Sequence, residues 1–193
     1  MTGRFITLEG PEGSGKSTLA NALAQRFPDA VLTREPGDGP AGPAIREALL
    51  HGGELDAWTE VFLFLADRRQ HVENVIRPAL EMGKLVISDR FADSTVVYQG
   101  YGRDLPVDLL RKLNRIATSG LTPDLTILLD LSAEAGLSRV FDKDRLDCEP
   151  LEFHERIREG FLMEARRDSG RWKVLDAAQP PDAILKEAVE ILG

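Results

Sequence analysis

Short runs of apolar residues alternate along the chain with longer segments in which apolar positions recur at helical spacing. The short runs are flanked by glycine, proline and charged residues, which is typical of buried strands, whereas the longer segments favour amphipathic helices. The predicted strands lie at about 4–9, 30–34, 84–88, 125–130 and 172–176. The predicted helices lie at about 15–26, 40–51, 57–82, 106–118, 132–140, 151–168 and 181–192. This alternation predicts an α/β protein with a parallel sheet.

The sequence of 193 residues is long enough for one large domain and offers no place to divide it. No internal repeat, low-complexity tract or long linker interrupts the pattern. The glycine- and proline-rich stretch at 34–43 is short enough to be a loop. We therefore expect a single doubly wound α/β domain over residues 1–193.

Composition narrows the possible partners and locations. The chain has 24 Lys and Arg against 32 Asp and Glu, a formal charge of -8, which disfavours binding to nucleic acid or to a membrane surface. The longest apolar run, at 61–66, is too short to span a bilayer, and the N-terminal residues lack the core of a signal peptide. Cys148 is the single cysteine, and the three histidines show no metal-ligand spacing. We expect a soluble, cytoplasmic protein without an intrachain disulfide.

A phosphate-loop pattern, Gly10-x-x-x-x-Gly15-Lys16-Ser17, follows the first predicted strand and precedes the first predicted helix. Glycines allow the backbone to curl so that successive N–H groups point at phosphate oxygens, and the helix N-terminus adds a partial positive charge. Lys16 is then placed to reach the outer phosphates, and the Ser17 hydroxyl is placed to bind Mg²⁺. The pattern in this context predicts a site for a nucleoside triphosphate.

The phosphate loop alone does not identify the reaction, since GTPases, ATPases and small-molecule kinases share it. The stretch FDKDR at 141–145 lacks the asparagine of a guanine-reading motif, so a GTPase is disfavoured. Asp89 and Arg90 emerge at the carboxyl end of the third predicted strand, where ligand sites of α/β proteins form. Asp89 is suited to hold Mg²⁺ through water and Arg90 to bind a phosphate, although a salt bridge at the end of a strand is the simpler alternative.

Phe64 and Arg68 are four residues apart in a predicted helix, so they share one of its faces. An aromatic ring beside a guanidinium suits a nucleobase, because the ring stacks on the base and the arginine donates to a carbonyl oxygen. The residues alone leave a second interpretation open, in which Phe64 packs in the core and Arg68 is solvated.

Four ordered segments bear on this choice: TREPGD (33–38), FLADRR (64–69), SDRFADSTVVYQG (88–100) and DRLDCEPLEFHER (144–156). Together with the phosphate loop, they resemble the thymidylate kinase family, bacterial class, from residue 4 to about 180. The resemblance implies transfer of the γ-phosphoryl group of MgATP to dTMP, giving ADP and dTDP for dTTP biosynthesis. It also implies a three-layer P-loop NTPase fold with a five-stranded parallel sheet, a short lid at about 139–150, and a homodimer.

The resemblance also implies roles for individual residues. The ATP phosphates would lie against Gly10, Pro11, Glu12, Gly13, Ser14, Gly15, Lys16, Ser17 and Thr18, with Ser17 and Asp89 serving Mg²⁺. The acceptor would be bound by Glu12, Arg34, Arg46, Phe64, Arg68, Arg90, Thr95, Tyr98 and Gln99. Within this set, Phe64 would stack on thymine and Arg68 would bind its O4. Glu12 would approach the sugar 3′-hydroxyl, and Tyr98 would fill the space of a ribose 2′-hydroxyl, unless it only packs in the core.

Two departures from the family pattern bear on catalysis. Asp38 stands where the family has glycine, which adds a negative charge near a phosphate-binding loop. The lid, SRVFDKDRLD at 138–147, is short, and the phosphate loop lacks an arginine. We therefore expect the cation for the transition state to be Arg145, with Arg139 as its partner and Lys143 as a supplement. Lys16, Asp89, Arg90, Arg145 and Arg139 form the predicted catalytic set.

Two other functions fit part of the sequence. A deoxynucleoside kinase would also carry a phosphate loop and an Asp-Arg pair, but a sugar hydroxyl needs a general base, whereas a phosphate monoester is already largely a dianion at neutral pH. Arg34, Arg90 and Arg46 supply the cations that a monophosphate needs, so we interpret Glu35 as a structural residue. A regulatory nucleotide-binding protein that has lost transfer activity is supported by the shortened lid alone.

Overall fold

The computed structural model describes residues 3–193. In chain order the elements are β1 (Arg4–Glu9), α1 (Lys16–Arg26), β2 (Val31–Arg34), α2 (Gly42–Leu50), α3 (Ala57–His71), the π-helical turn η1 (Val72–Ile76), α4 (Arg77–Glu81), β3 (Leu85–Asp89), α5 (Ala92–Thr95), the π-helical segment η2 (Val96–Gly102), α6 (Val107–Ala117), β4 (Leu125–Asp130), α7 (Ala133–Ser138), α8 (Leu151–Arg167), β5 (Trp172–Asp176) and α9 (Pro181–Leu192). The α/β class predicted from the sequence is confirmed.

The five strands form one parallel sheet in the order β2-β3-β1-β4-β5. Strand β1 lies at the centre, with Phe5 opposite Val86 of β3 and Ile6 opposite Leu125 of β4. Because all strands run the same way, their carboxyl ends meet at one edge of the sheet. The phosphate loop after β1 and the Asp-Arg pair at the end of β3 are therefore neighbours, as ligand sites in such folds require.

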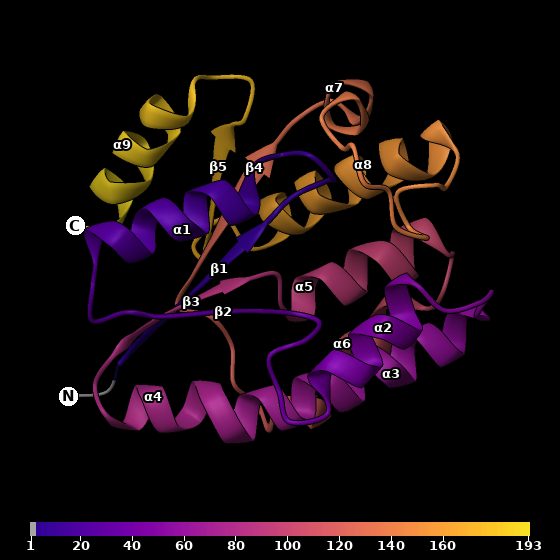
Figure 1. Cartoon of the computed structure of the whole chain (residues 1–193), viewed down its shortest axis with the longest axis horizontal. Coiled ribbons are helices and arrows are strands. Elements are labelled where there is room, and N and C mark those ends of the chain that lie inside the picture. Colours follow the sequence, from indigo (N-terminus) through magenta and orange to yellow (C-terminus); the bar gives the residue numbers. More distant parts are fainter. Residues whose placement is uncertain (1–2) are drawn as a thin grey trace.

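Alternating side chains of the strands pack against helices on the two faces of the sheet. Ile6 and Leu8 of β1 pack with Leu23 of α1 and Ile184 of α9, so α1 and α9 cover one face. Phe5, the neighbouring residue, packs instead on the opposite face, against η1 and α4. Figure 1 shows α1 and α9 side by side above the strands, with α4 on the other side of the sheet. The three layers are those of the predicted fold.

The helices differ from the sequence prediction in two places. The predicted helix at 57–82 is a continuous α3–η1–α4 segment that widens into π geometry just before Pro78, whose ring has no N–H to continue the regular ladder. The helical stretch 92–102 was not predicted, because its β-branched residues and glycines have low helix propensity. Packing of this segment against α8 overrides that propensity. In the described part of the chain, each helix is too short or too polar to cross a membrane.

Candidate active site

A cavity of about 810 Å³ opens at the carboxyl edge of the sheet, between the phosphate loop, the helical segment 92–102 and the start of α9. Most of the predicted site residues line it: Glu12, Gly13, Ser14, Gly15, Lys16, Ser17, Thr18, Arg34, Arg46, Phe64, Arg68, Asp89, Arg90, Thr95, Tyr98, Gln99 and Arg139. Gly10 and Pro11 contribute backbone carbonyls to the same loop. Arg145 and Lys143, its predicted supplement, lie apart from both the cavity lining and the loop.

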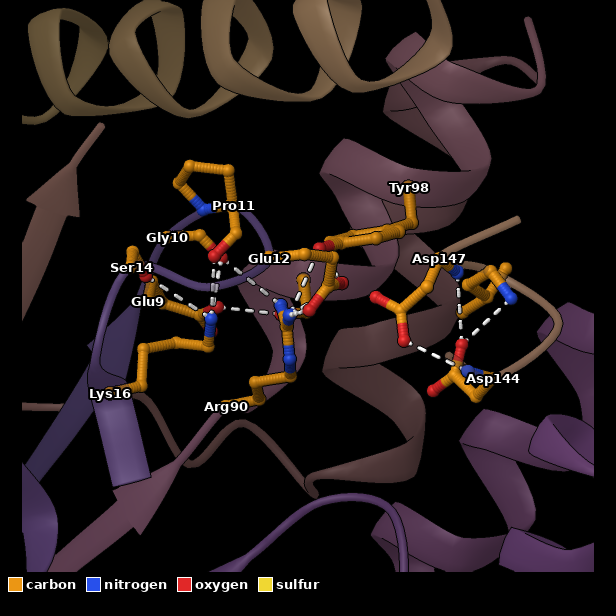
Figure 2. Close-up of polar contacts among 12 residues, drawn as sticks. Glu9, Gly10, Pro11, Glu12, Ser14, Lys16, Arg90, Tyr98, Asp144 and Asp147 are labelled. Atoms are coloured by element: carbon orange, nitrogen blue, oxygen red, sulfur yellow. Dashed lines mark hydrogen bonds and ion pairs between the residues drawn. The ribbon is translucent and has the colours of Figure 1, made fainter. Parts of the chain in front are cut away.

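Lys16 folds back onto the phosphate loop that carries it. Its Nζ donates to the carbonyl oxygens of Gly10 and Pro11, at 3.0 and 2.8 Å (Figure 2). Burial and the neighbouring Arg90 guanidinium lower the pKa of Lys16 to about 8, against the opposing effect of Glu12. Lys16 can therefore lose its positive charge at a pH only slightly above neutral.

Two glycines bring the phosphate loop against helix α7. Gly13 has a φ of 65°, and a Cβ built on it would lie 2.0 Å from the carbonyl oxygen of Gly136. A Cβ on Gly136 would in turn lie 2.2 Å from the carbonyl oxygen of Glu12. The contact therefore requires glycine on both sides, and it places the end of α7, with Arg139 directly after it, next to the donor phosphate site.

The two predicted magnesium ligands meet at the other side of the loop. The Ser17 hydroxyl donates to Asp89 Oδ2 at 2.5 Å, which joins the start of α1 to the end of β3. A hydroxyl and a carboxylate are the oxygen ligands that Mg²⁺ prefers, and Mg²⁺ commonly uses only one or two protein ligands beside phosphates and water. No group of three or more His, Cys, Asp or Glu residues within 3–193 offers an alternative metal site. These residues fit the ion.

Arg90, Glu12 and Tyr98 form a cluster between the phosphate loop and the helical segment 92–102 (Figure 2). Arg90 Nη2 donates to both carboxylate oxygens of Glu12, at 2.7 and 2.8 Å, and to the Tyr98 hydroxyl at 2.9 Å. Tyr98 donates in turn to Glu12 at 2.5 Å. Burial raises the pKa of Glu12, but Arg90 and Lys16 outweigh burial and lower it to about 2. Glu12 is therefore an ionised acceptor at the centre of the site.

A buried carboxylate that was not predicted from the sequence, that of Glu9, supports this cluster through hydrogen bonds. Glu9 accepts hydrogen bonds from the Phe91 backbone N–H at 2.9 Å and from the Ser94 hydroxyl at 2.6 Å. Ser94 also accepts from Arg90 Nη1 at 3.2 Å, so Glu9 fixes the turn in which Arg90 adopts a φ of 68°. Burial and the nearby Asp93 raise the pKa of Glu9 to about 7. Glu9 directly precedes Gly10, the first glycine of the phosphate loop, and this position could have indicated from the sequence that Glu9 belongs to the site.

Arg68 is fully buried, and each of its three guanidinium nitrogens donates to the protein. Nε and Nη2 pair with the carboxylate of Glu35, Nη1 donates to Thr95 Oγ1 at 2.9 Å and to Asn114 at 2.6 Å, and Nη2 donates to the Phe91 carbonyl at 3.1 Å. A direct bond from Arg68 to a base would have to share or displace one of these partners. Glu35 has the supporting position that the sequence analysis gave it.

The end of the cavity beside Arg68 is lined by Phe64 and Gln99. Gln99 is 1% exposed, and its Nε2 donates to Glu60 Oε2 at 3.0 Å. Gln99 Oε1 is buried and has no hydrogen-bond partner among the described residues. Glu60, on α3 one turn before Phe64, was not predicted as a site residue. Its i, i+4 spacing to Phe64, and that of Phe64 to Arg68, was a usable signal, because all three share a helix face.

Arg34 and Arg46, which were predicted to bind the phosphate of the acceptor, both line the cavity. Arg46 Nη1 donates to the Pro36 carbonyl at 2.8 Å, and Arg34 is exposed at the end of β2. Asp38, the departure from the family pattern, accepts from the Arg34 backbone N–H at 2.9 Å and from Thr33 Oγ1 at 2.8 Å. Its other oxygen lies 3.6 Å from Arg34 Nε. The added charge is thus directed at Arg34.

The two arginines predicted for the lid have different environments. Arg139 is exposed, lines the cavity and donates to the Ala177 carbonyl at 3.2 Å. Arg145 is instead held by Glu60 at 2.7 Å and by the Leu49 carbonyl at 3.0 Å, which ties the lid to α2 and α3. Arg139 therefore lines the cavity in this structure, whereas Arg145 does not.

A turn within the lid, which includes Arg145, contributes Asp144 and Leu146 to the cavity wall. The Asp144 backbone N–H donates to Asp147 Oδ2 at 2.9 Å, and Asp144 Oδ1 accepts from the Asp147 backbone N–H at 3.0 Å (Figure 2). Burial raises the pKa of Asp147 to about 6, and the nearby carboxylate of Glu12 adds to the shift. This reciprocal pair holds the turn rigid without a helix.

A phosphate loop and a wall of arginines that face one cavity define a P-loop kinase, an enzyme that moves a phosphoryl group from a nucleoside triphosphate to a second substrate. The family model described as thymidylate kinase matches residues 8–188. The chain belongs to the thymidylate kinase family, and as a member of it the chain is an ATP-dependent nucleoside-monophosphate kinase. The family indicated by the sequence motifs is confirmed.

Individual relatives cover nearly the whole chain. The thymidylate kinase of Nitratidesulfovibrio vulgaris is 48% identical over 205 residues, which span 98% of this chain and 92% of that protein. The thymidylate kinase of Desulfovibrio desulfuricans is 49% identical over 94% of this chain and 91% of its own length. The crystal structure of thymidylate kinase from Ehrlichia chaffeensis superposes with a TM-score of 0.81 at 32% identity, covering all of both chains. The similarity therefore extends across the phosphate loop, the cavity and the lid.

Proposed function

We propose that the chain transfers the γ-phosphoryl group of ATP to dTMP, giving ADP and dTDP, by holding both nucleotides in the single cavity. The observation that carries this proposal is the continuity of the cavity, which joins the phosphate loop to the Phe64 and Gln99 end through a wall that includes Arg34, Arg46 and Arg90. A volume of about 810 Å³ is within the usual range for ligand pockets. Transfer without a covalent enzyme intermediate needs this arrangement, with donor and acceptor in line.

The donor end is formed by residues that already touch one another. Lys16 would exchange the carbonyl oxygens of Gly10 and Pro11 for phosphate oxygens, and backbone N–H groups of the loop would bind the remaining ones. Ser17 and Asp89 would hold Mg²⁺, which when bound neutralises charge on the outer phosphates. Arg139, beside the loop, is our candidate for the cation that stabilises the transition state; Arg145 would first have to leave Glu60.

The acceptor base would be recognised by stacking and by two polar atoms. Phe64 is half-buried at the end of the cavity and offers its ring to a pyrimidine. Thr95 accepts from Arg68, which leaves its hydroxyl proton available to the O4 of thymine, so that Arg68 acts on the base through Thr95. Gln99 Oε1 would accept from the N3–H of the base. These groups match the imide edge of thymine.

The sugar and the phosphate of the acceptor would lie between these ends. The ionised Glu12 would accept a hydrogen bond from the 3′-hydroxyl. Tyr98, whose ring centroid lies 4.9 Å from Arg90 Cζ, would occupy the space of a 2′-hydroxyl. Arg34, Arg46 and Arg90 would neutralise the phosphate dianion, so no general base is required. Because transfer to water would waste ATP, we expect the lid to close over both nucleotides.

A homodimer belongs to the same proposal. Large apolar side chains are exposed on α3 and α6, which pack against each other: Phe62 is 59% exposed, Ile116 72% and Leu109 42%. Apolar surface gathered on two neighbouring helices is typical of a protein–protein interface. Light scattering coupled to size exclusion should give twice the chain mass of 21.3 kDa.

A coupled assay of ADP release tests the proposed reaction with dTMP, dUMP, dCMP, UMP and thymidine as acceptors. We expect release that depends on the acceptor, strongest with dTMP, and little ATP hydrolysis when no acceptor is present. Activity with thymidine alone would favour the nucleoside kinase. Release that no acceptor increases would favour a protein that only binds nucleotide.

A further inference from the structure

We propose that Glu60 is a positioning residue that sets the base preference of the acceptor site, because it fixes the side-chain amide of Gln99 in one orientation. The inference rests on the proposed function and adds the origin of its selectivity. Glu60 does not line the cavity and would not touch either nucleotide. Its effect would pass entirely through Gln99, which does line the cavity.

Glu60 is a carboxylate with no exposed surface, surrounded by donors. Gln99 Nε2 donates to its Oε2 at 3.0 Å. Arg103 Nη2 and Arg145 Nη1 donate to its Oε1, at 3.0 and 2.7 Å. A carboxylate that faces two guanidinium groups and an amide NH₂ group only accepts hydrogen bonds. Glu60 therefore cannot donate to any neighbour.

This chemistry decides which end of the Gln99 amide faces the cavity. Because Glu60 only accepts, the NH₂ group of Gln99 must face it, and the amide oxygen must point elsewhere. That oxygen is buried and unpartnered, which costs free energy until a donor reaches it. The N3–H of thymine or uracil is such a donor, whereas cytosine presents an unprotonated N3 that would face the oxygen with a second lone pair. The fixed amide thus selects an imide edge and rejects cytosine.

Arg68 cannot enforce this selection alone, since each of its guanidinium nitrogens already donates to a protein partner. Thr95 is also an incomplete discriminator, because a hydroxyl can rotate to donate or to accept. Gln99 would be equally ambiguous if its amide were free to flip. Glu60 removes the ambiguity, and this makes it the residue on which discrimination between the two pyrimidine classes depends.

The test compares binding of dTMP, dUMP and dCMP to the full-length protein by isothermal titration calorimetry. In Glu60→Gln, the amide oxygen of residue 60 stays with Arg103 and Arg145, and its NH₂ group faces Gln99. The Gln99 amide then turns its oxygen to residue 60 and its NH₂ group to the cavity. We expect the preference for dTMP over dCMP to fall by about tenfold, the usual scale of one hydrogen bond to a group that must otherwise stay unpaired. The preference for dTMP over dUMP should stay unchanged, because both bases present the same imide edge.

Two further variants separate positioning from a general structural role. In the exchange Glu60→Gln with Gln99→Glu, the carboxylate at 99 accepts from the amide at 60 and still turns an oxygen to the cavity, so the preference for dTMP over dCMP should return. Arg145→Met removes a neighbouring partner of Glu60 while leaving Gln99 bonded to it, and should retain the preference. Thermal unfolding of each variant identifies loss of fold. If Glu60→Gln does not fold, the exchange variant, with its charge and volume conserved, decides the question.

The outcomes are distinct. A Glu60→Gln protein that folds and keeps the dTMP over dCMP preference of the wild type within twofold overturns the inference, as does an exchange variant that folds but discriminates poorly. Equal losses in Arg145→Met and Glu60→Gln would assign the effect to the lid and also overturn it. Because these are binding measurements, they remain decisive if the protein binds dTMP without phosphorylating it, a result that would refute the proposed function alone.

Discussion

Replacement of the two lid arginines tests which of them acts on the transferred phosphoryl group. Arg139 lines the cavity, and within residues 3–193 its side chain makes one hydrogen bond, to the Ala177 carbonyl at 3.2 Å, so it is available to a nucleotide. Removal of an arginine that stabilises transition-state charge costs ~10³-fold in kcat, about 4 kcal/mol. We therefore expect Arg139→Ala to lower kcat by about three orders of magnitude, and Arg139→Lys to recover only part of it, because lysine lacks the planar fork.

Arg145→Ala should behave differently. It removes one donor from Glu60, which retains Gln99 and Arg103, so the expected loss is about 1–3 kcal/mol in the free energy of unfolding. The expected loss in kcat is less than about tenfold. Steady-state ADP release at saturating ATP and dTMP gives kcat for both variants, and urea unfolding gives their stability. A larger kcat loss in Arg145→Ala than in Arg139→Ala would refute this reasoning, since it would show that Arg145 leaves Glu60 during turnover.

Three further changes probe other parts of the site. Burial and Arg90 lower the pKa of Lys16 to about 8, so Lys16 loses its positive charge as the pH rises beyond that value. We therefore expect kcat/KM for ATP to decline above pH 8. A profile that stays flat to about pH 9.5 would contradict this. Phe64→Ala should weaken dTMP by on the order of tenfold while leaving ATP nearly unchanged, measured by calorimetry; equal weakening of both would assign Phe64 to the core. Gly136→Ala places a Cβ 2.2 Å from the Glu12 carbonyl oxygen, so it should displace the loop, raise KM for ATP by at least about tenfold and lower the free energy of unfolding by about 1–3 kcal/mol. An unchanged KM would show that the loop can move away from α7 at no cost.

The strands were predictable because each is an apolar run bounded by turn residues, and the phosphate loop because a short local motif specifies it. The helical segment 92–102 was not, since its β-branched residues and glycines disfavour a helix until α8 packs against it. The sheet and the phosphate loop could therefore be predicted from local sequence, whereas the helical segment 92–102, which lines the predicted acceptor site, could not.

The polar partners of the site were harder to predict, because they are far apart in the sequence. Arg145 and Glu60 are 85 residues apart, and nothing local to either one indicates that they pair. Arg68 was placed at the base from its spacing to Phe64, but its four partners come from three other segments and engage all three of its guanidinium nitrogens. A motif can therefore identify residues that gather at a site without showing which of their hydrogen bonds remain available to a ligand.

In the proposed reaction, a phosphoryl group passes from ATP directly to the phosphate of dTMP within one cavity. The most direct measurement is ³¹P NMR of the purified protein with ATP, Mg²⁺ and dTMP over time. The account predicts that the resonances of dTDP and ADP grow together in equal amounts, with little inorganic phosphate. Inorganic phosphate growing with ADP while dTMP stays unchanged would contradict it.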